Sequence, residues 1–221
     1  GSLLLSLPHR NIGLAGRATY SYDSRYFGEL NFGYNGSERL AAGHRFEFFP
    51  AVSAGWVASS EKFWEPISKY INHFKIRGSY GLVGSDAFAS GAPHFLYQNN
   101  IGIGSAHNFW TGLPTSEISK KGPGFYVLAV QDAGWEHVKK FDIGFDMMLF
   151  NQLNITFDYF HDKRERILMS RASWPSMLGY WGSKPWSNIG EVENQGFELS
   201  LNWTKPVSYT HLRAHETSAH L

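Results

Sequence analysis

The 221-residue chain contains no cysteine, and its charges nearly cancel. The absence of cysteine excludes a disulfide framework, a cysteine-ligated zinc site and a thiol nucleophile. With 20 Lys and Arg residues against 19 Asp and Glu residues, the net charge of +1 gives no electrostatic footprint for binding nucleic acid. The chain also lacks any run of about 18 consecutive apolar residues, so no transmembrane helix is predicted.

Aromatic residues and glycine, by contrast, are abundant. Aromatic residues make up 16% of the chain, there are 23 glycines, and the charged residues reach only 18%. Aromatic rings pack well on pleated sheets, and glycine serves turns and bends. This composition therefore favours an all-β protein over a helical one.

Seven stretches of the chain alternate apolar and polar residues with the period of two that β-strands show. In one of them, Phe141, Ile143 and Phe145 alternate with charged residues that include Asp142 and Asp146. The predicted strands cover residues 11–23, 26–35, 50–58, 73–82, 140–149, 153–159 and 194–203. Most are longer than the usual strand of a soluble protein and are close to the length that crosses a bilayer at a tilt.

The links between these strands alternate between short and long. Tight turns are predicted at Asp23–Arg25 and Asn151–Gln152, whereas the longest link runs from Val83 to Lys139. The medium link Ser59–Asn72 is predicted to form a short helix. Short turns on one side and long loops on the other are typical of outer-membrane barrels, and a structureless link as long as Val83–Lys139 is unusual inside a compact soluble domain.

Aromatic residues gather near the ends of the predicted strands. Examples are Tyr22 and Tyr26 at the first turn, and Phe48, Phe49 and Trp56 around the third strand. An amphipathic ring at such a position can bridge acyl chains and headgroups, so these residues are predicted to form interfacial girdles. The alternative is that they fill the core of a soluble β-sandwich.

Three sequence motifs resemble those of one protein family. Residues 48–56 read FFPAVSAGW, residues 76–81 read IRGSYG, and residues 188–199 read NIGEVENQGFEL. These segments resemble, in order, motifs of the SusC-type (SusC/RagA) TonB-dependent outer-membrane transporters, where the first reads FFPSxSAGW. The resemblance covers nearly all of residues 8–205.

The resemblance implies an antiparallel transmembrane β-barrel of roughly 22 strands with long extracellular loops, closed around an N-terminal plug domain. Residues 1–206 would be about seven strands of the later part of that barrel. Seven strands alone would leave two sheet edges that lipid cannot hydrogen-bond, so the rest of the barrel is expected to pair with them. The resemblance implies residence in the outer membrane of a bacterium, in contact with the lipid bilayer.

The resemblance also implies a function and partners. It implies TonB-dependent import of oligosaccharides, with a SusD-like surface lipoprotein as a lid and the TonB complex acting through the plug, which this chain does not include. Some relatives are thought to import peptides, so the ligand is a glycan or a peptide. No enzymatic activity, cofactor or nucleic-acid partner is implied.

The last residues of the chain differ in character from the rest. Residues 207–221 resemble one reading frame of a translated sequencing adapter, and we expect them to be a non-native tail without selected function. They include His215 and His220, whose separation of five residues differs from the HExxH spacing of zinc proteases. No metal site is therefore predicted there.

Candidate ligand-contacting residues lie in the predicted outer loops. They are Trp110, Trp174, Tyr180, Trp181 and Trp186. The faces of aromatic rings can stack on the C–H faces of sugars and on cationic groups. The alternative is that these rings pack loop against loop or against a partner. No catalytic residues are predicted, and Asp142 and Asp146 are interpreted as polar lining of the barrel lumen.

Two other classes of protein share parts of this pattern. A passive porin or structural barrel would show the same alternation without TonB dependence. A soluble β-sandwich sugar-binding module would also alternate and could use the tryptophan-rich loops.

Overall fold

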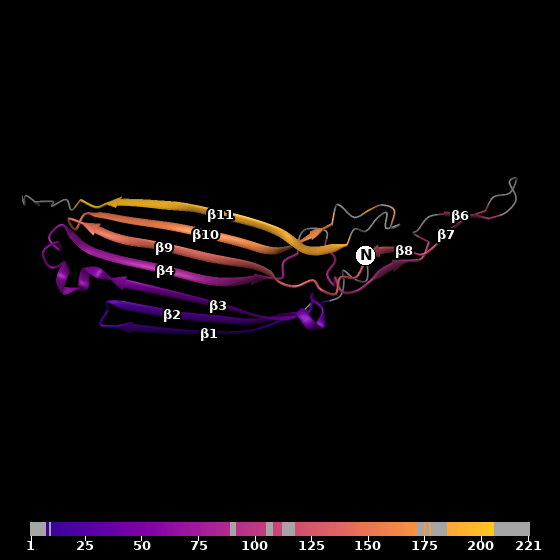
Figure 1. Ribbon diagram of the computed structural model, residues 1–221, viewed down its shortest axis with the longest axis horizontal. Coiled ribbons are helices and arrows are strands. Elements are labelled where there is room, and N and C mark those ends of the chain that lie inside the picture. Colours follow the sequence, from indigo (N-terminus) through magenta and orange to yellow (C-terminus); the bar gives the residue numbers. More distant parts are fainter. Residues whose placement is uncertain are drawn as a thin grey trace, which may run out of the picture.

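The computed structural model describes residues 8, 10–88, 92–104, 108–111, 118–171, 175, 177 and 185–205. Its main element is a seven-stranded antiparallel sheet in which the strands follow the order β1-β2-β3-β4-β9-β10-β11 (Figure 1). The strands are β1 (Asn11–Tyr22), β2 (Tyr26–Ser37), β3 (Phe46–Val57), β4 (Ile71–Ser85), β9 (Glu136–Leu149), β10 (Leu153–Ser170) and β11 (Trp186–Trp203). All seven predicted strands are present, and the all-β prediction is confirmed. No helix in the described part of the chain is long and apolar enough to cross a membrane.

Several strands are longer than predicted. β4 has 15 residues and β9 has 14, whereas β10 and β11 have 18 each. The sequence pattern missed these extensions because stretches in their outer ends, such as residues 161–166, carry polar side chains on both faces. A pattern search for apolar–polar alternation therefore stops where the apolar face stops.

Short and long connections lie at opposite ends of the sheet (Figure 1). The turns β1–β2 and β9–β10 each have two central residues with positive φ, Asp23–Ser24 in one and Phe150–Asn151 in the other. Positive φ at both positions is a feature of the type I′ turn, whose twist suits hairpins. Each turn here joins its strands through three residues, because Tyr22 pairs with Tyr26 and Leu149 pairs with Leu153. We refer to this end as the turn end and to the opposite end as the loop end.

The third connection at the turn end, between β3 and β4, corrects one prediction. In place of the short helix expected at Ser59–Asn72, the chain forms two 3-10 turns, η2 (Ala58–Ser60) and η3 (Lys62–Trp64), followed by further turns. The segment is held by side chains: Trp64 Nε1 donates to the Ile71 carbonyl at 3.0 Å. Its ring also stacks on Phe74 with centroids 5.3 Å apart. These contacts fix a compact connector without a regular helix.

The sheet has one apolar and one polar face, as the alternation predicted. Across β4, β9, β10 and β11, the register aligns Ile76, Phe145, Phe157 and Leu199 in one row. The adjacent row aligns Arg77, Gly144, Asp158 and Glu198. The apolar face is largely uncovered: Leu30 is 62% exposed, Leu199 61% and Phe197 75%. An apolar face of this extent requires an apolar surrounding or a partner.

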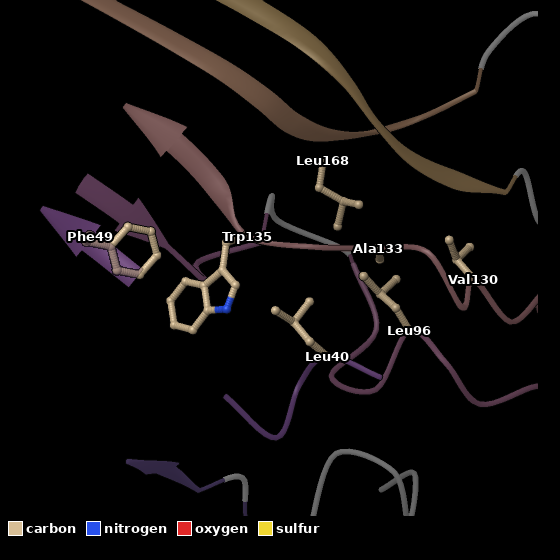
Figure 2. Packing of buried hydrophobic residues seen from close by; sticks show 7 residues of the cluster. All are labelled: Leu40, Phe49, Leu96, Val130, Ala133, Trp135 and Leu168. Atoms are coloured by element: carbon tan, nitrogen blue, oxygen red, sulfur yellow. The ribbon is translucent and has the colours of Figure 1, made fainter. Parts of the chain in front are cut away.

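A small hydrophobic core lies at the loop end rather than under the sheet (Figure 2). The β3–β4 ladder stops at the pair Ala51–Gly81, although β3 stays paired with β2 as far as Phe46 and β4 with β9 as far as Ser85. The two strands therefore diverge, and side chains fill the space between them. The cluster consists of Leu40, Phe49, Leu96, Val130, Ala133, Trp135 and Leu168.

Phe49 belongs to this core and corrects the prediction that it is part of an interfacial girdle. Its side chain is only 6% exposed, and its ring meets Trp135 edge-on with centroids 5.5 Å apart. Gly84 makes this possible, because a Cβ there would overlap the Phe49 ring. Phe48, on the opposite face of the same strand, is 52% exposed and fits the girdle prediction.

The longest loop carries two small two-stranded sheets that the sequence did not predict. β5 (Asn100–Gly102) pairs with β8 (Gly124–Val127), and β6 (Asn108–Thr111) pairs with β7 (Ile118–Lys121). Together they form an arm that projects away from the sheet at the loop end (Figure 1). Residues 207–221 lie outside the described residues, so the predicted non-native tail stays a prediction.

Candidate functional site

The polar face carries a cluster of charges centred on Arg77 of β4. The Arg77 guanidinium contacts Asp142 at 3.7 Å and Asp146 at 3.3 Å, both on the neighbouring strand β9. It also reaches Asp158 on β10, two strands away, at 2.7 Å. One cation thus links three strands, and the three carboxylates outnumber it.

Gly144 allows Arg77 to reach across β9. In the register, Gly144 lies directly between Arg77 and Asp158. A Cβ at this position would overlap the Asp158 carboxylate, so any side chain there would block the contact. The absence of a side chain at residue 144 is therefore part of the geometry of the cluster.

Beside this cluster, the polar face is hollowed into a pocket of about 580 Å³. Its floor is formed by β1 to β4, and one side by β9. The lining includes Thr19, Ser21, Phe27, Glu29, Ser53, Lys75, Arg77, Ser79 and Asp142. Hydroxyl groups, charged groups and the Phe27 ring therefore converge on one concave surface, which is a common composition for a binding site.

At the loop end, Asn188 ties β11 to the base of the longest loop. The Asn188 amide donates to the carbonyl of Gly134 at 3.0 Å and to that of Arg166 at 2.7 Å, and its oxygen accepts from the Gly134 N–H at 3.0 Å. Arg166 adopts a positive φ of 59°, a conformation that non-glycine residues rarely take. Asn188 satisfies backbone groups that this irregular segment would otherwise leave unpaired.

A second group of contacts stabilises the turn end. The Glu61 carboxylate accepts hydrogen bonds from the Tyr26 hydroxyl at 2.6 Å, Arg25 at 3.0 Å and Trp56 Nε1 at 3.4 Å. These donors favour the charged form, so the pKa of Glu61 is lowered, chiefly by the hydrogen bond from Tyr26. The β3–β4 connector is thereby fastened to the β1–β2 turn.

Two of the five predicted ligand-contacting residues are described by the structure, and they lie in different surroundings. Trp110 lies on β6 in the projecting arm and is 64% exposed. Trp186 is the first residue of β11 rather than a loop residue, and its ring packs against the loop-end core, which favours the packing alternative. Trp174, Tyr180 and Trp181 lie outside the described residues. The structure does not bring Trp110 and Trp186 together in one site.

Sequence reasoning placed Asp142 and Asp146, and likewise Lys75 and Arg77, on the polar sides of their strands. It did not group these residues into one site, and it missed Phe27. The signal available was their alternation along the strand, which Arg77 shares with Lys75. Their spatial grouping depends on β4 pairing with β9 across the longest loop, and that pairing has no local sequence signal. Among the described residues, no group of three or more His, Asp or Glu side chains is arranged to hold a metal ion.

Comparisons with known proteins agree on a family. The TonB dependent receptor-like, beta-barrel family matches residues 6–219. TonB-dependent receptor P3 of Formosa agariphila is 29% identical over 192 residues, which cover 86% of this chain and 18% of that protein. TonB-dependent receptor SusC of Bacteroides thetaiotaomicron is 25% identical over 204 residues, which cover 87% of this chain and 18% of that protein. The chain spans less than a fifth of the length of these curated relatives.

Solved structures show the same fold. The RagAB peptide importer in the closed-closed state superposes with a TM-score of 0.69 at 19% identity, over 90% of this chain and 20% of that chain. The siderophore receptor PirA from Pseudomonas aeruginosa superposes with a TM-score of 0.53 at 12% identity, over 87% of this chain and 31% of that chain. In both cases the seven-stranded sheet corresponds to part of a larger chain.

Proposed function

This chain belongs to the TonB-dependent receptor β-barrel family of the bacterial outer membrane, and we propose that it forms part of the wall of a SusC-type importer of oligosaccharides. The observation that carries the proposal is the two-faced sheet. Its apolar face, with Leu199 61% exposed, suits lipid, and its polar face suits a water-filled lumen.

The two outer strands of the sheet support a wall segment of a larger barrel. β1 pairs only with β2, and β11 only with β10, among the described residues. A membrane barrel has no free edges, because lipid cannot hydrogen-bond the backbone. Further strands of the parent transporter would pair with both edges.

The partners follow from the family and form part of the proposal. A SusD-like surface lipoprotein would cover the loop end, and the TonB complex would act through a plug domain elsewhere in the parent protein. The exposed Trp110 on the projecting arm would contact the ligand or the lipoprotein. The family consists of transport receptors rather than enzymes, and we propose no catalytic activity for this chain.

A peptide is the second candidate cargo. The observation that favours it is the likeness to the RagAB peptide importer, with a TM-score of 0.69. An oligosaccharide is favoured by the sequence identity to SusC, 25% over 204 residues. The polar pocket near Arg77 offers hydroxyl and charged groups that suit either cargo.

Uptake by the source organism tests the proposal. The parent gene is deleted, and uptake of labelled oligosaccharides and of labelled peptides is compared with that of the intact strain and of a strain lacking TonB. We expect loss of uptake of one cargo class in both mutant strains. Uptake that depends on the parent gene but persists without TonB would identify a passive porin and refute the proposal.

A further inference from the structure

We propose that Lys75 and the pocket beside it bind a negatively charged group of the cargo, specifically a carboxylate, as the cargo passes along the inner wall. This inference rests on the proposed function, because it assigns a ligand class to the polar face of an importer. It concerns the wall of the barrel rather than the outer loops where Trp110 lies.

The charges that line the pocket are almost all paired within the sheet. Glu29 accepts hydrogen bonds from Arg17 and from Asn31. Asp142 lies 3.7 Å from Arg77, which also binds Asp146 and Asp158. Arg77 is shared among three carboxylates, so its positive charge is already compensated and it offers little attraction to an anionic ligand.

Lys75 is different. Among the described residues, no carboxylate forms an ion pair with its ammonium group. Its neighbour in the register, Asp146, is already bound by Arg77 at 3.3 Å and by the Thr156 hydroxyl at 3.1 Å. The ammonium group of Lys75 therefore lines the pocket without a carboxylate partner from the sheet, and it can donate charge-assisted hydrogen bonds to a ligand.

The position of the Lys75 side chain is defined by two residues on neighbouring strands. Its stem passes over Gly55, where a Cβ would lie 3.5 Å from Lys75 Cε. Its ammonium group lies 5.6 Å from the centre of the Phe27 ring. A cation over an aromatic face is held weakly compared with an ion pair, so a carboxylate can bind it without breaking a strong internal contact.

The rest of the pocket fits an organic acid better than a bare ion. At about 580 Å³, the pocket has room for a sugar unit or an amino-acid residue. The Phe27 ring offers an apolar face, and Ser53 and Ser79 bring hydroxyl groups to the lining. A uronic-acid unit of an oligosaccharide and the C-terminus of a peptide share this chemistry, a carboxylate next to an apolar and hydrogen-bonding body.

The test uses the full-length parent transporter in outer-membrane vesicles of its source organism and two matched pairs of probes. Short oligogalacturonides are compared with their methyl esters, and short peptides with their C-terminal amides. Within each pair the molecules differ by the negative charge of the carboxylate. Equilibrium binding is measured for the parent, for Lys75→Gln and for Lys75→Arg, with Lys140→Gln as the control.

Lys140 is a suitable control because it lies on the same face of the sheet and is paired with Asp162 at 3.0 Å. We expect the parent to bind the acid of one pair about tenfold more tightly than its neutral partner, which is the effect of one charge-assisted hydrogen bond. Lys75→Gln should abolish this preference, and Lys75→Arg and Lys140→Gln should keep it. The pair that shows the preference distinguishes a sugar acid from a peptide.

Amine footprinting provides a measurement that needs no variant. The parent is acetylated in the presence of each probe, and modification of Lys75 and Lys140 is read by mass spectrometry. We expect the preferred acid to protect Lys75 several-fold, its neutral partner to leave Lys75 reactive, and neither to protect Lys140. An acid that is not preferred over its neutral partner, or that leaves Lys75 reactive, would overturn the proposal.

A third outcome would assign Lys75 to another role. If Lys75→Gln raised the entry of vancomycin into cells and left the preference for acids unchanged, Lys75 would contact the plug domain of the parent instead of cargo. That result would also overturn the proposal. Loss of all uptake on deletion of the parent gene, measured separately, reports on the importer function and is independent of the preference for acids.

Discussion

Replacing Phe145 by arginine tests the assignment of the two faces of the sheet. Phe145 lies near the middle of β9 on the apolar face, in register with Ile76 and Phe157. Its ring stacks on Phe157 with centroids 5.5 Å apart and contacts the ring of Phe74 at 5.8 Å. Phe145→Arg would place a guanidinium group among these rings, at the depth of the bilayer centre.

The expected cost has two parts. An arginine on the lipid face of a β-barrel near the midplane costs about 2–4 kcal/mol. Loss of the two ring pairs of Phe145 adds about 0.5–1.5 kcal/mol for each pair. The sum of about 3–7 kcal/mol lowers the folding equilibrium constant at least a hundredfold, because each 1.4 kcal/mol is about a factor of ten.

Thr156→Arg is the matched control. Thr156 is adjacent to Phe157 in β10, so it lies at nearly the same depth as Phe145, but it faces the polar side. Its hydroxyl donates to Asp146 at 3.1 Å, and an arginine at this position can pair with the same carboxylate. We expect this variant to change the free energy of folding by less than about 1 kcal/mol.

The assay is reversible folding of the full-length parent into lipid vesicles, followed by urea titration and by the heat-modifiable mobility of the folded barrel. The unfolding transition of Phe145→Arg should occur at a much lower urea concentration than that of the parent. The transition of Thr156→Arg should occur at the same urea concentration as that of the parent. An equal loss of folding free energy in both variants, or a greater loss in Thr156→Arg, would refute the assignment of the faces.

Three further substitutions test local contacts. Arg77→Gln removes the counter-charge of Asp158 and its neighbours, and we expect a loss of about 1–3 kcal/mol in the same urea titration. Asn188→Ala removes the hydrogen bonds at the base of the longest loop, and protease should cut that loop several-fold faster on intact cells. Glu61→Gln removes a carboxylate whose pKa is lowered chiefly by the Tyr26 hydroxyl. Because the folded-state pKa is lowered, the stability from Glu61 is fully present above the unfolded-state pKa, so this variant should be less stable than the parent at pH 7. The difference should shrink as the pH falls below the unfolded-state pKa of about 4.3 and disappear once the pH has passed through the lower folded-state pKa.

Each of these predictions has a control substitution. Lys140→Gln breaks a single pair on the polar face and should cost less than Arg77→Gln. Asn202→Ala changes an exposed asparagine of β11 far from the loop base and should leave proteolysis unchanged. Glu65→Gln lies in the same connector as Glu61 and should match the parent in stability at pH 7. If a control showed the same change as the variant it is paired with, the role assigned to the contact of that variant would be wrong.

The strands of the sheet could be predicted well because the pattern that identifies each strand lies within that strand. Alternation within each strand identifies both the strand and its two faces, as the row of Phe145 and Phe157 shows. The ends of β10 and β11 were missed because alternation of apolar and polar residues ends where the apolar face ends. The two small sheets of the longest loop were missed because their strands are short and lack such alternation.

The polar cluster could be predicted only in part because its geometry is non-local. Asp142 and Asp146 could be placed on the polar face, but their partner Arg77 lies on a strand separated from them by the longest loop. The contact with Asp158 further depends on the missing side chain of Gly144, which a single sequence does not mark as special. Trp186 was assigned to a loop because the extension of β11 was not predicted.

The root of the longest loop has a consequence for how such transporters diversify. The loop leaves β4 at Ser85 and returns to β9 at Glu136, and these two residues are paired directly across the ladder. The two ends of the loop are therefore adjacent in the sheet. Each doubling of the loop length raises the entropic cost of closing it by only about 0.6 kcal/mol. Leu96 and Val130 belong to the loop-end core and are joined by a backbone hydrogen bond of 2.7 Å. The part of the loop beyond these two residues can therefore be lengthened, shortened or exchanged to change recognition at the cell surface, while the core and the wall beneath it keep their packing and register.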